Sequence, residues 1–453
     1  MQPGGAGVSG EPGHGSARWL ALGLAALVMG LSVTLVVVVA TATGRGGSAE
    51  AAERIDTAAG EVPVAVAGSF GTPAAPGSAL DPFSSSADGD RVVAAVLADL
   101  SQYWTTTVDA GGRTALRAPA GGFVSVDSAA PAEPGFRALC ITDPAQIAGN
   151  TFYCPAQDGI AFDSSALVPV LLGSYGSAGL VASFAHEFGH AVQAQVGPTP
   201  ADRRADPSRY PALLIEAQAD CAAGAFLAAA SGADTSRTDT SSTDTTDAAR
   251  PEHVHLPTAS LTRAVAPLLD FRDRPTVPPT DAAAHGLALD RLDSVLHGYR
   301  SGGLSCWAMT TADLSPTLGR AGVVTDPPST PRYGSTDAAV AAAASSVAGF
   351  AGSAAAAPDP ADLDRSAGIG QFAAGAAVAR ATGRALTGDD AGAACFTGAW
   401  TAAVFGSAAP GTLGSWGGDA DEALDLIRSR PGAAFAELAA FADGFHGGRG
   451  ACS

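Results

Sequence analysis

The sequence predicts an α+β protein that is mainly helical, with a small edge sheet, a degenerate helical repeat and a single N-terminal transmembrane helix. Three observations carry this prediction. One uncharged apolar run near the N-terminus is long enough to cross a bilayer, most later apolar segments have helical spacing, and two parts of the chain repeat the same short motifs. At 453 residues the chain is also too long for one ordinary domain, so more than one folded unit is expected.

The apolar run occupies residues 19–42 and contains no charged side chain. As a helix it would be about 36 Å long, which is enough to cross a hydrocarbon core of about 30 Å. A cleaved signal peptide is the alternative, but its apolar core is usually shorter, at about 7–15 residues. We therefore expect a single-pass anchor in the cell membrane, preceded by a cytoplasmic tail at 1–18 and followed by a flexible stalk at 43–88.

Charge and cysteine content limit the partners and the cellular compartment that we expect for the rest of the chain. The protein has 25 basic residues, all of them arginine, against 44 acidic residues, and its net charge is −19. This charge argues against a nucleic-acid partner, because phosphate binding needs a basic face. All six cysteines follow the apolar run, and an even number in a chain with an export signal indicates disulfides. We therefore expect residues 43–453 to lie outside the cytoplasm.

Two short apolar runs separated by Pro, Gly and Asn predict short strands over residues 138–163. Cys140 and Cys154 lie in this segment. A bridge between them would close a loop of about 15 residues and stabilise the fold by roughly 3 kcal/mol in the chain-entropy model. Two unpaired buried thiols are the alternative.

The other four cysteines fall in motifs that recur later in the chain. The stretch LDRLDSVLHGYRSGGLSC ends at Cys306 and has the same layout as FAELAAFADGFHGGRGAC, which ends at Cys452. ADCAAGAF around Cys221 resembles AACFTGAW around Cys395, and AVQAQVG at 191–197 resembles AVARATG at 377–383, at an offset of 186. The matches suggest the pairs Cys221–Cys306 and Cys395–Cys452. They also predict a degenerate duplication, in which residues 364–453 keep the helices and lack metal ligands. Coincidence in a sequence rich in Ala and Gly is the alternative.

The stretch SFAHEFGHAVQAQVG, residues 183–197, contains the pattern H-E-x-x-H. On an α-helix, positions i and i+4 lie on one face, so His186 and His190 can present ring nitrogens to one ion. Glu187 lies beside them, where its carboxylate can act as a general base toward water. The pattern therefore predicts a zinc centre, with a chance match in an Ala-rich chain as the alternative.

A catalytic zinc centre needs three protein ligands and one open position. The favoured third ligand is Glu216, which lies 216 − 190 = 26 residues after the second histidine, far enough for the chain to return as another helix. One turn later, Asp220 can accept a hydrogen bond from His186 and so fix the orientation of that ring. The alternative for both carboxylates is that they lie on a solvated acidic face of the helix and bind no metal. The rival third ligands are His253 and His255.

These residues also resemble a known family. HEFGHAVQ followed by EAQADCAAG, with NTFYCPAQDGIAFD upstream, is similar to the bacterial neutral zinc metallopeptidases and their pattern HE-x-GH-x-x-Q, then E-x-Q-A-D-C-x-A-G. The resemblance implies a zincin-like domain over residues 89–310, with two helices crossing at a Zn²⁺ ion. Residues 311–363 are rich in Pro, Ser and Ala, which predicts a linker with room for a short helix near 336–346, before the degenerate repeat domain at 364–453. The resemblance assigns zinc binding to His186, His190 and Glu216, base catalysis to Glu187 and histidine orientation to Asp220.

Together these features predict a membrane-anchored zinc peptidase that acts outside the cytoplasm and hydrolyses peptide or protein substrates, with Glu187 as general base. An edge strand near residues 159–162 would bind substrate by strand addition. One alternative is a non-catalytic envelope binding protein that retains the metallopeptidase-like domain, and another is a zinc hydrolase of non-peptide bonds. Candidate donors to the reacting oxygen are Tyr175, Tyr210, His253 and His255.

Overall fold

The computed structural model describes residues 54–55, 64–66, 87–110, 116–233, 251, 253–320, 323–325, 331–407 and 412–452. These residues belong to one compact unit within residues 49–453. The expected cytoplasmic tail (1–18), the transmembrane helix (19–42) and most of the stalk (43–88) lie outside the described residues.

The structure is 61% helix with a small sheet, which confirms the mainly helical α+β class. The strands are β1 (Arg54–Ile55), β2 (Val64–Val66), β3 (Gly122–Val126), β4 (Thr151–Cys154), β5 (Gly159–Asp163) and β6 (Val254–His255). The helices are α1 (Ala87–Ala110), α2 (Leu167–Val196), α3 (Pro200–Ala205), α4 (Ala212–Ala230), α5 (Leu261–Asp270), α6 (Ala288–Ser301), α7 (Gly303–Cys306), α8 (Thr336–Ala351), α9 (Pro360–Ser366), α10 (Gln371–Thr387), α11 (Asp390–Ser407), α12 (Asp419–Arg428) and α13 (Phe435–Gly447).

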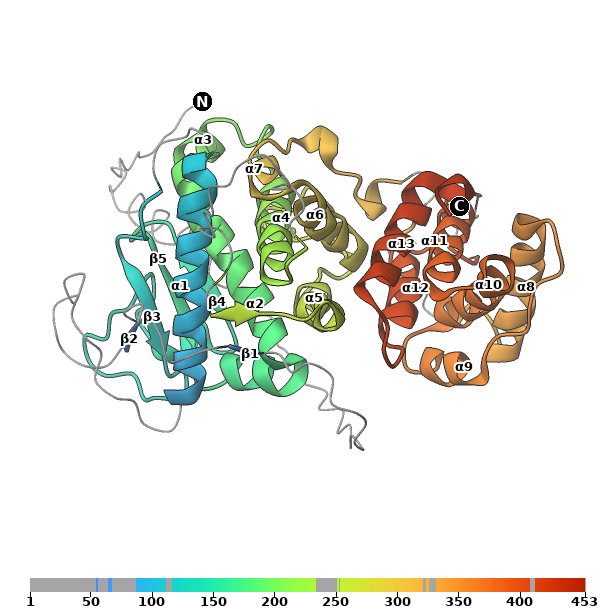
Figure 1. Cartoon of the computed structure of the whole chain (residues 1–453), viewed down its shortest axis with the longest axis horizontal. Helices are drawn as coiled ribbons and strands as arrows, with labels where there is room; N and C mark the ends of the chain where they lie inside the picture. The colour runs from blue at the N-terminus through green and yellow to red at the C-terminus, as the bar shows by residue number, and fades with distance from the viewer. Residues whose placement is uncertain are drawn as a thin grey trace, which may run out of the picture. The chain divides into compact units, whose positions relative to one another are not determined.

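The main sheet has the strand order β2-β3-β5-β4 and packs against α2 (Figure 1). β3 and β5 are parallel, and β4 is antiparallel to β5. Aromatic side chains join sheet to helix, since the Phe162 and Phe184 ring centroids lie 5.3 Å apart. The strand predicted at 159–162 is therefore interior, and β2 and β4 are the outer strands among the described ones. The prediction of an exposed edge there was wrong, because the hairpin places β4 outside β5.

The helix with the H-E-x-x-H pattern is the second part of α2. The backbone leaves helical geometry at Gly176, whose φ of 68° favours glycine, and a new helical segment begins after it. This segment crosses α4 closely, because a Cβ placed on Gly189 would lie 3.1 Å from the Cα of Ala219. α2 and α4 are long and apolar enough to cross a membrane, but 89% of the apolar window of α4 is buried, which is typical of a core helix.

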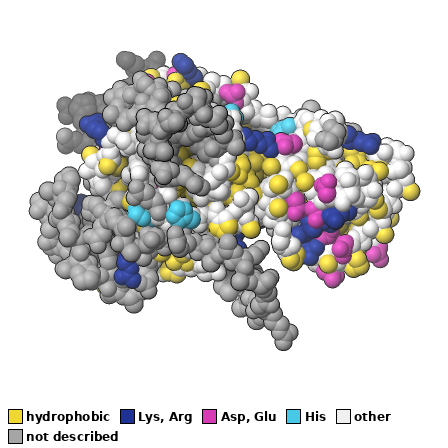
Figure 2. Space-filling model, viewed as in Figure 1, with side chains coloured by type: hydrophobic (Ala, Val, Ile, Leu, Met, Phe, Trp, Pro, Cys, Tyr) yellow, Lys and Arg dark blue, Asp and Glu magenta, His cyan; other side chains and the backbone are white. Residues whose placement is uncertain are grey.

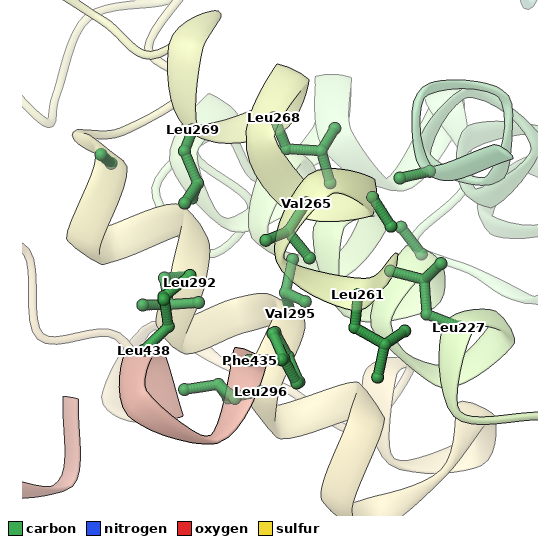
Figure 3. Packing of buried hydrophobic residues seen from close by; sticks show 14 of the residues in the cluster. Leu227, Leu261, Val265, Leu268, Leu269, Leu292, Val295, Leu296, Phe435 and Leu438 are labelled. Carbon is green, nitrogen blue, oxygen red and sulfur yellow. The ribbon is translucent and has the colours of Figure 1, made fainter. Parts of the chain in front are cut away.

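All six cysteines are paired in the expected way, as Cys140–Cys154, Cys221–Cys306 and Cys395–Cys452. The second of these bonds joins the middle of α4 to α7, and the third joins α11 to the end of the described chain. In Figure 3, apolar side chains of α4, α5, α6 and α13 form one packed cluster, in which Leu438 lies beside Leu292.

Part of the expected linker at 311–363 is helical and packed. α8 buries Ala339, Ala343 and Val347 and contacts α10. The C-terminal helical group therefore begins before residue 364, because the alanine-rich stretch in the expected linker packs as a helix.

Candidate metal centre

The crossing of α2 and α4 brings His186, His190 and Glu216 together. Their ligand atoms all lie within 4.8 Å of one another, and among the described residues this is the group of three or more His, Cys, Asp or Glu side chains that can hold a metal ion. Nε2 of His186 lies 3.2 Å from Oε2 of Glu216, and Nε2 of His190 lies 3.4 Å from the same oxygen. The two histidines predicted from i,i+4 spacing and the carboxylate predicted from a later helix are thus placed side by side.

These distances fit a tetrahedral zinc ion. With zinc–ligand bonds of about 2.0–2.1 Å, two ligand atoms at adjacent corners lie about 3.3 Å apart. Glu216 Oε2 is also buried and makes no hydrogen bond, although both rings face it. A buried carboxylate oxygen without a hydrogen-bond partner is costly, and a cation between it and the rings would satisfy it.

His186 is oriented by a buried chain of charged groups. Its Nδ1 lies 2.7 Å from Oδ1 of Asp220, so Nδ1 donates to Asp220 and Nε2 is the ring nitrogen left to bind a metal ion beside Glu216. Arg291, on α6, donates to both oxygens of Asp220 at 2.8 Å. The prediction for Asp220 therefore agrees with its position in the structure. Arg291 was missed because no local pattern connects it with α4.

The charges around this chain favour a cation. Burial disfavours the charged form of Asp220, yet Arg291 and then His186 hold the pKa of that carboxyl below its ordinary value. Burial also disfavours a protonated His186, but Asp220 and Glu216 outweigh it and raise the pKa of the ring to about 10. The field of the two carboxylates thus stabilises positive charge, as a proton or as a metal ion, where the rings meet.

A pair of glutamines holds His190 in place and connects it to the segment at Met309. Gln193 Oε1 lies 3.2 Å from His190 Nδ1, and the Gln193 amide donates to Gln218 at 2.7 Å and to the carbonyl of Ile215. Gln218 in turn donates to the carbonyl of Met309. Both glutamines belong to the family pattern, at the Q of HE-x-GH-x-x-Q and of E-x-Q-A-D-C, but neither was predicted to have a role at the centre. Their place in the pattern was the available signal.

Glu187 points toward the edge strand. The backbone N–H of Tyr153, in β4, donates to Glu187 Oε2 at 3.1 Å. Burial raises the pKa of Glu187, while His186 and His190 oppose the rise. A carboxylate with a raised pKa holds a proton more readily, which suits a group that takes a proton and returns it.

A further histidine faces the centre and was not predicted. His285 Nε2 lies 3.8 Å from Glu216 Oε2, and its Nδ1 lies 3.6 Å from Asp273 Oδ1. Asp273 also accepts the backbone N–H groups of His285 and Gly286, which fixes the loop. The His285 side chain is 44% exposed, so solvent reaches it beside the much less exposed His186, His190 and Glu216.

Most of the other candidate residues lie elsewhere. His253 faces Asp99, which also accepts its backbone N–H, and His255 is an exposed residue of β6 paired with β1. The Tyr175 hydroxyl donates to Asp270. The rival third-ligand positions, and Tyr175 as a donor at the centre, are therefore not supported. Tyr210 packs against the main core, half-buried.

Comparison of the chain with protein-family models, curated proteins and solved structures gave no match. The function is therefore inferred from the geometry and chemistry of the centre.

Proposed function

We propose that the protein is a zinc-dependent peptidase, anchored in the membrane through residues 19–42, that hydrolyses peptide bonds outside the cytoplasm. The observation that carries the proposal is the buried, unpartnered oxygen of Glu216, which faces the two imidazole nitrogens at 3.2 and 3.4 Å. Among the described residues the group has three ligands, and three protein ligands with an open position are typical of a catalytic zinc centre, whereas structural zinc usually has four.

Zinc bound there would lower the pKa of a coordinated water toward neutrality and polarise a substrate carbonyl. Glu187 is the residue that accepts the water proton and delivers it to the leaving amine, because it is the carboxylate next to the ligand histidines that is not itself a ligand. Its hydrogen bond from Tyr153 holds it toward β4.

β4 is the element on which an extended peptide would lie. It is one of the two outer strands of the main sheet among the described strands, with β2 at the other edge, and its Tyr153 N–H is directed at Glu187 rather than at β5. A peptide added along this edge would run past the general base.

His285 is the group that would stabilise negative charge developing on the substrate carbonyl oxygen. Its Nε2 faces the ligand cluster while Asp273 lies behind its Nδ1, an arrangement that lets the ring donate toward the substrate.

The test compares the full-length chain with Glu187→Gln and Glu216→Ala. We expect the native chain and Glu187→Gln to hold equal zinc, with hydrolysis of an unfolded protein only by the native chain. Glu216→Ala should lose most of its zinc. Zinc retained in full by Glu216→Ala would contradict the ligand assignment. Equal zinc without hydrolysis of any substrate by the native chain would favour the non-catalytic binding protein.

A further inference from the structure

α4 and α6 cross with their backbones in close contact. A Cβ placed on Gly224 would lie 1.9 Å from the carbonyl oxygen of Val295, and one on Gly298 would lie 1.8 Å from that of Cys221. Only glycine fits at either position, and the Cys221–Cys306 disulfide joins α4 to α7, which directly follows α6.

α11 and α13 cross in the same way. A Cβ on Gly398 would lie 2.0 Å from the carbonyl oxygen of Phe441, and one on Gly444 would lie 2.0 Å from that of Cys395. The Cys395–Cys452 disulfide closes this second pair. Each residue of α11 stands 398 − 224 = 174 positions after its counterpart in α4, and each residue of α13 stands 444 − 298 = 146 positions after its counterpart in α6.

The relation extends to the helix that carries the histidines. Gly189 of α2 packs on Ala219 and Ala222 of α4, and Gly383 of α10 packs on the residues 174 positions later, Ala393 and Phe396. The offset between α2 and α10 is therefore 383 − 189 = 194.

A hydrogen bond supports the same offset. Gln193 donates to the carbonyl of Ile215, and Thr387, 194 positions later, donates to that of Asp389, 174 positions later. Sequence letters suggested a different alignment, AVQAQVG at 191–197 with AVARATG at 377–383, at an offset of 186. That alignment was wrong by eight residues.

These contacts fix the offsets between the two copies. Each proposed metal ligand of the first copy can therefore be matched to a residue of the second copy. His186 corresponds to 186 + 194 = 380, His190 to 190 + 194 = 384 and Glu216 to 216 + 174 = 390. The residues at these positions are Arg380, Arg384 and Asp390.

Their arrangement repeats that of the metal centre. Arg380 donates to Asp390 Oδ1 at 2.8 Å, and Arg384 pairs with the same oxygen. In both places, two side chains one turn apart on one helix converge on a single carboxylate oxygen from the crossing helix. Glu216 faces two imidazole rings, whereas its counterpart Asp390 faces two guanidinium groups.

We infer that α10, α11 and α13 are a second copy of α2, α4 and α6, in which the guanidinium groups of Arg380 and Arg384 supply to Asp390 the positive charge that a metal ion would supply to Glu216. The second copy therefore keeps the geometry of a metal site but does not need the ion. The two arginine side chains supply the positive charge instead, because arginine stays charged at every physiological pH.

The groups that orient the ligand histidine have changed as well. The counterpart of Asp220 is 220 + 174 = 394, which is Ala394, and the counterpart of Arg291 is 291 + 146 = 437, which is Glu437. Glu437 pairs with Arg430, which also reaches Asp390 at 3.5 Å. Figure 2 shows acidic and basic side chains interspersed over the visible face of the C-terminal helices, as expected of a unit that relies on ion pairs.

The decisive experiment restores the ligands in the full-length chain, with Arg380→His, Arg384→His and Asp390→Glu together. After zinc loading and gel filtration, we expect zinc per folded chain to rise from one to two. In a chain that also carries His186→Ala and His190→Ala, it should rise from zero to one. The matched control, Arg380→Gln with Arg384→Gln and Asp390→Asn, should bind no added zinc. A folded triple histidine–glutamate variant without additional zinc would overturn the inference.

A second measurement uses the native chain, without any substitution in the second copy. Hydrogen exchange of the native chain, with and without a zinc chelator, should show lost protection in α4 and unchanged protection in α11. Equal loss in both helices, or two zinc ions per native chain, would overturn the inference. Both experiments count metal or protection rather than turnover, so their outcome is separate from that of the peptidase proposal.

Discussion

Arg291 shows how much the metal centre depends on side chains that are distant in sequence. It lies 71 residues from Asp220, which is why no spacing rule could identify it. His186, Glu187 and His190 follow from helical geometry, and Glu216 and Asp220 from a second pattern within one helix. His285 comes from a loop that helices α5 and α6 bring to the centre. The residues of the proposed metal centre could therefore be predicted, whereas the groups that hold them in place needed the tertiary structure.

Arg291→Met should weaken zinc binding by about 10–100-fold, because Asp220 would no longer be held toward His186. It should also lower the free energy of unfolding by about 3–5 kcal/mol, since it leaves the Asp220 charge buried without its partner. The matched control is Arg300→Met on the same helix. Arg300 and Asp443 are each nearly half exposed, so removing that pair should cost less than about 1 kcal/mol. Chelator competition and urea unfolding measure the two effects, and unchanged zinc affinity in folded Arg291→Met would refute the orienting role.

His285→Ala should lower the turnover rate by about 10²-fold or more while zinc content stays the same, because the residue acts on the substrate oxygen and not on the metal. His255→Ala removes an exposed histidine from β6 and should change neither quantity. Zinc analysis and initial rates on one unfolded protein substrate decide the question. Loss of zinc in His285→Ala would instead identify the residue as a fourth ligand.

At the scale of helices, the position of the ligands is set by how closely α4 approaches its neighbours. Glycines stand at the crossings with α2 and α6, where a larger residue would push the backbones apart. The sequence indicated these helices through their apolar spacing. It did not show which face of each helix meets which neighbour, because alanine fits nearly any helical contact.

Gly224→Ala should destabilise the protein by about 1–3 kcal/mol or more, because its Cβ would press on the backbone oxygen of Val295, which cannot rotate away as a side chain would. Gly173→Ala, in the first part of α2, is the matched control. No atom lies within 4 Å of a Cβ placed there, and the change should stabilise the helix by about 0.5–1 kcal/mol. Urea midpoints of the two variants measure the difference, and equal midpoints would show that the crossing can relax.

For the whole molecule, the success of the sequence prediction depended on anchoring residues. The offset of 146 between α6 and α13 was found because Cys306 and Cys452 mark it, and the pairs Cys221–Cys306 and Cys395–Cys452 followed from such marks. Cys140–Cys154 followed instead from the closeness of the two cysteines in the sequence. The offset between α2 and α10 was misread because AVQAQVG and AVARATG hold only small apolar residues at the matched positions. The same shortage of distinctive residues made α8 part of an expected linker.

The stability of the whole chain should fall as pH rises from about 5 to about 8. Burial raises the pKa of several carboxyl groups, to about 6 in Asp90 and Asp421 and to about 7 in Asp290 and Glu422. Each folded group then holds a proton that the unfolded chain has already released, so stability is lost as pH rises toward the folded pKa. Carboxyls with lowered pKa, such as Asp220, act in the opposite sense, but only below about pH 4.

Glu422→Gln isolates one of these groups. Burial, followed by the charge of Asp419, raises the pKa of Glu422, and Arg332 opposes the rise. Its Oε2 accepts the Phe372 N–H at 2.8 Å, a bond that glutamine can keep. Urea unfolding at pH 5 and pH 8 should show a decline in stability that is smaller in the variant by about 1–3 kcal/mol. Zinc binding changes with pH equally in both chains and cancels in this difference, so equal declines would mean that Glu422 titrates in the folded chain as it does in the unfolded one.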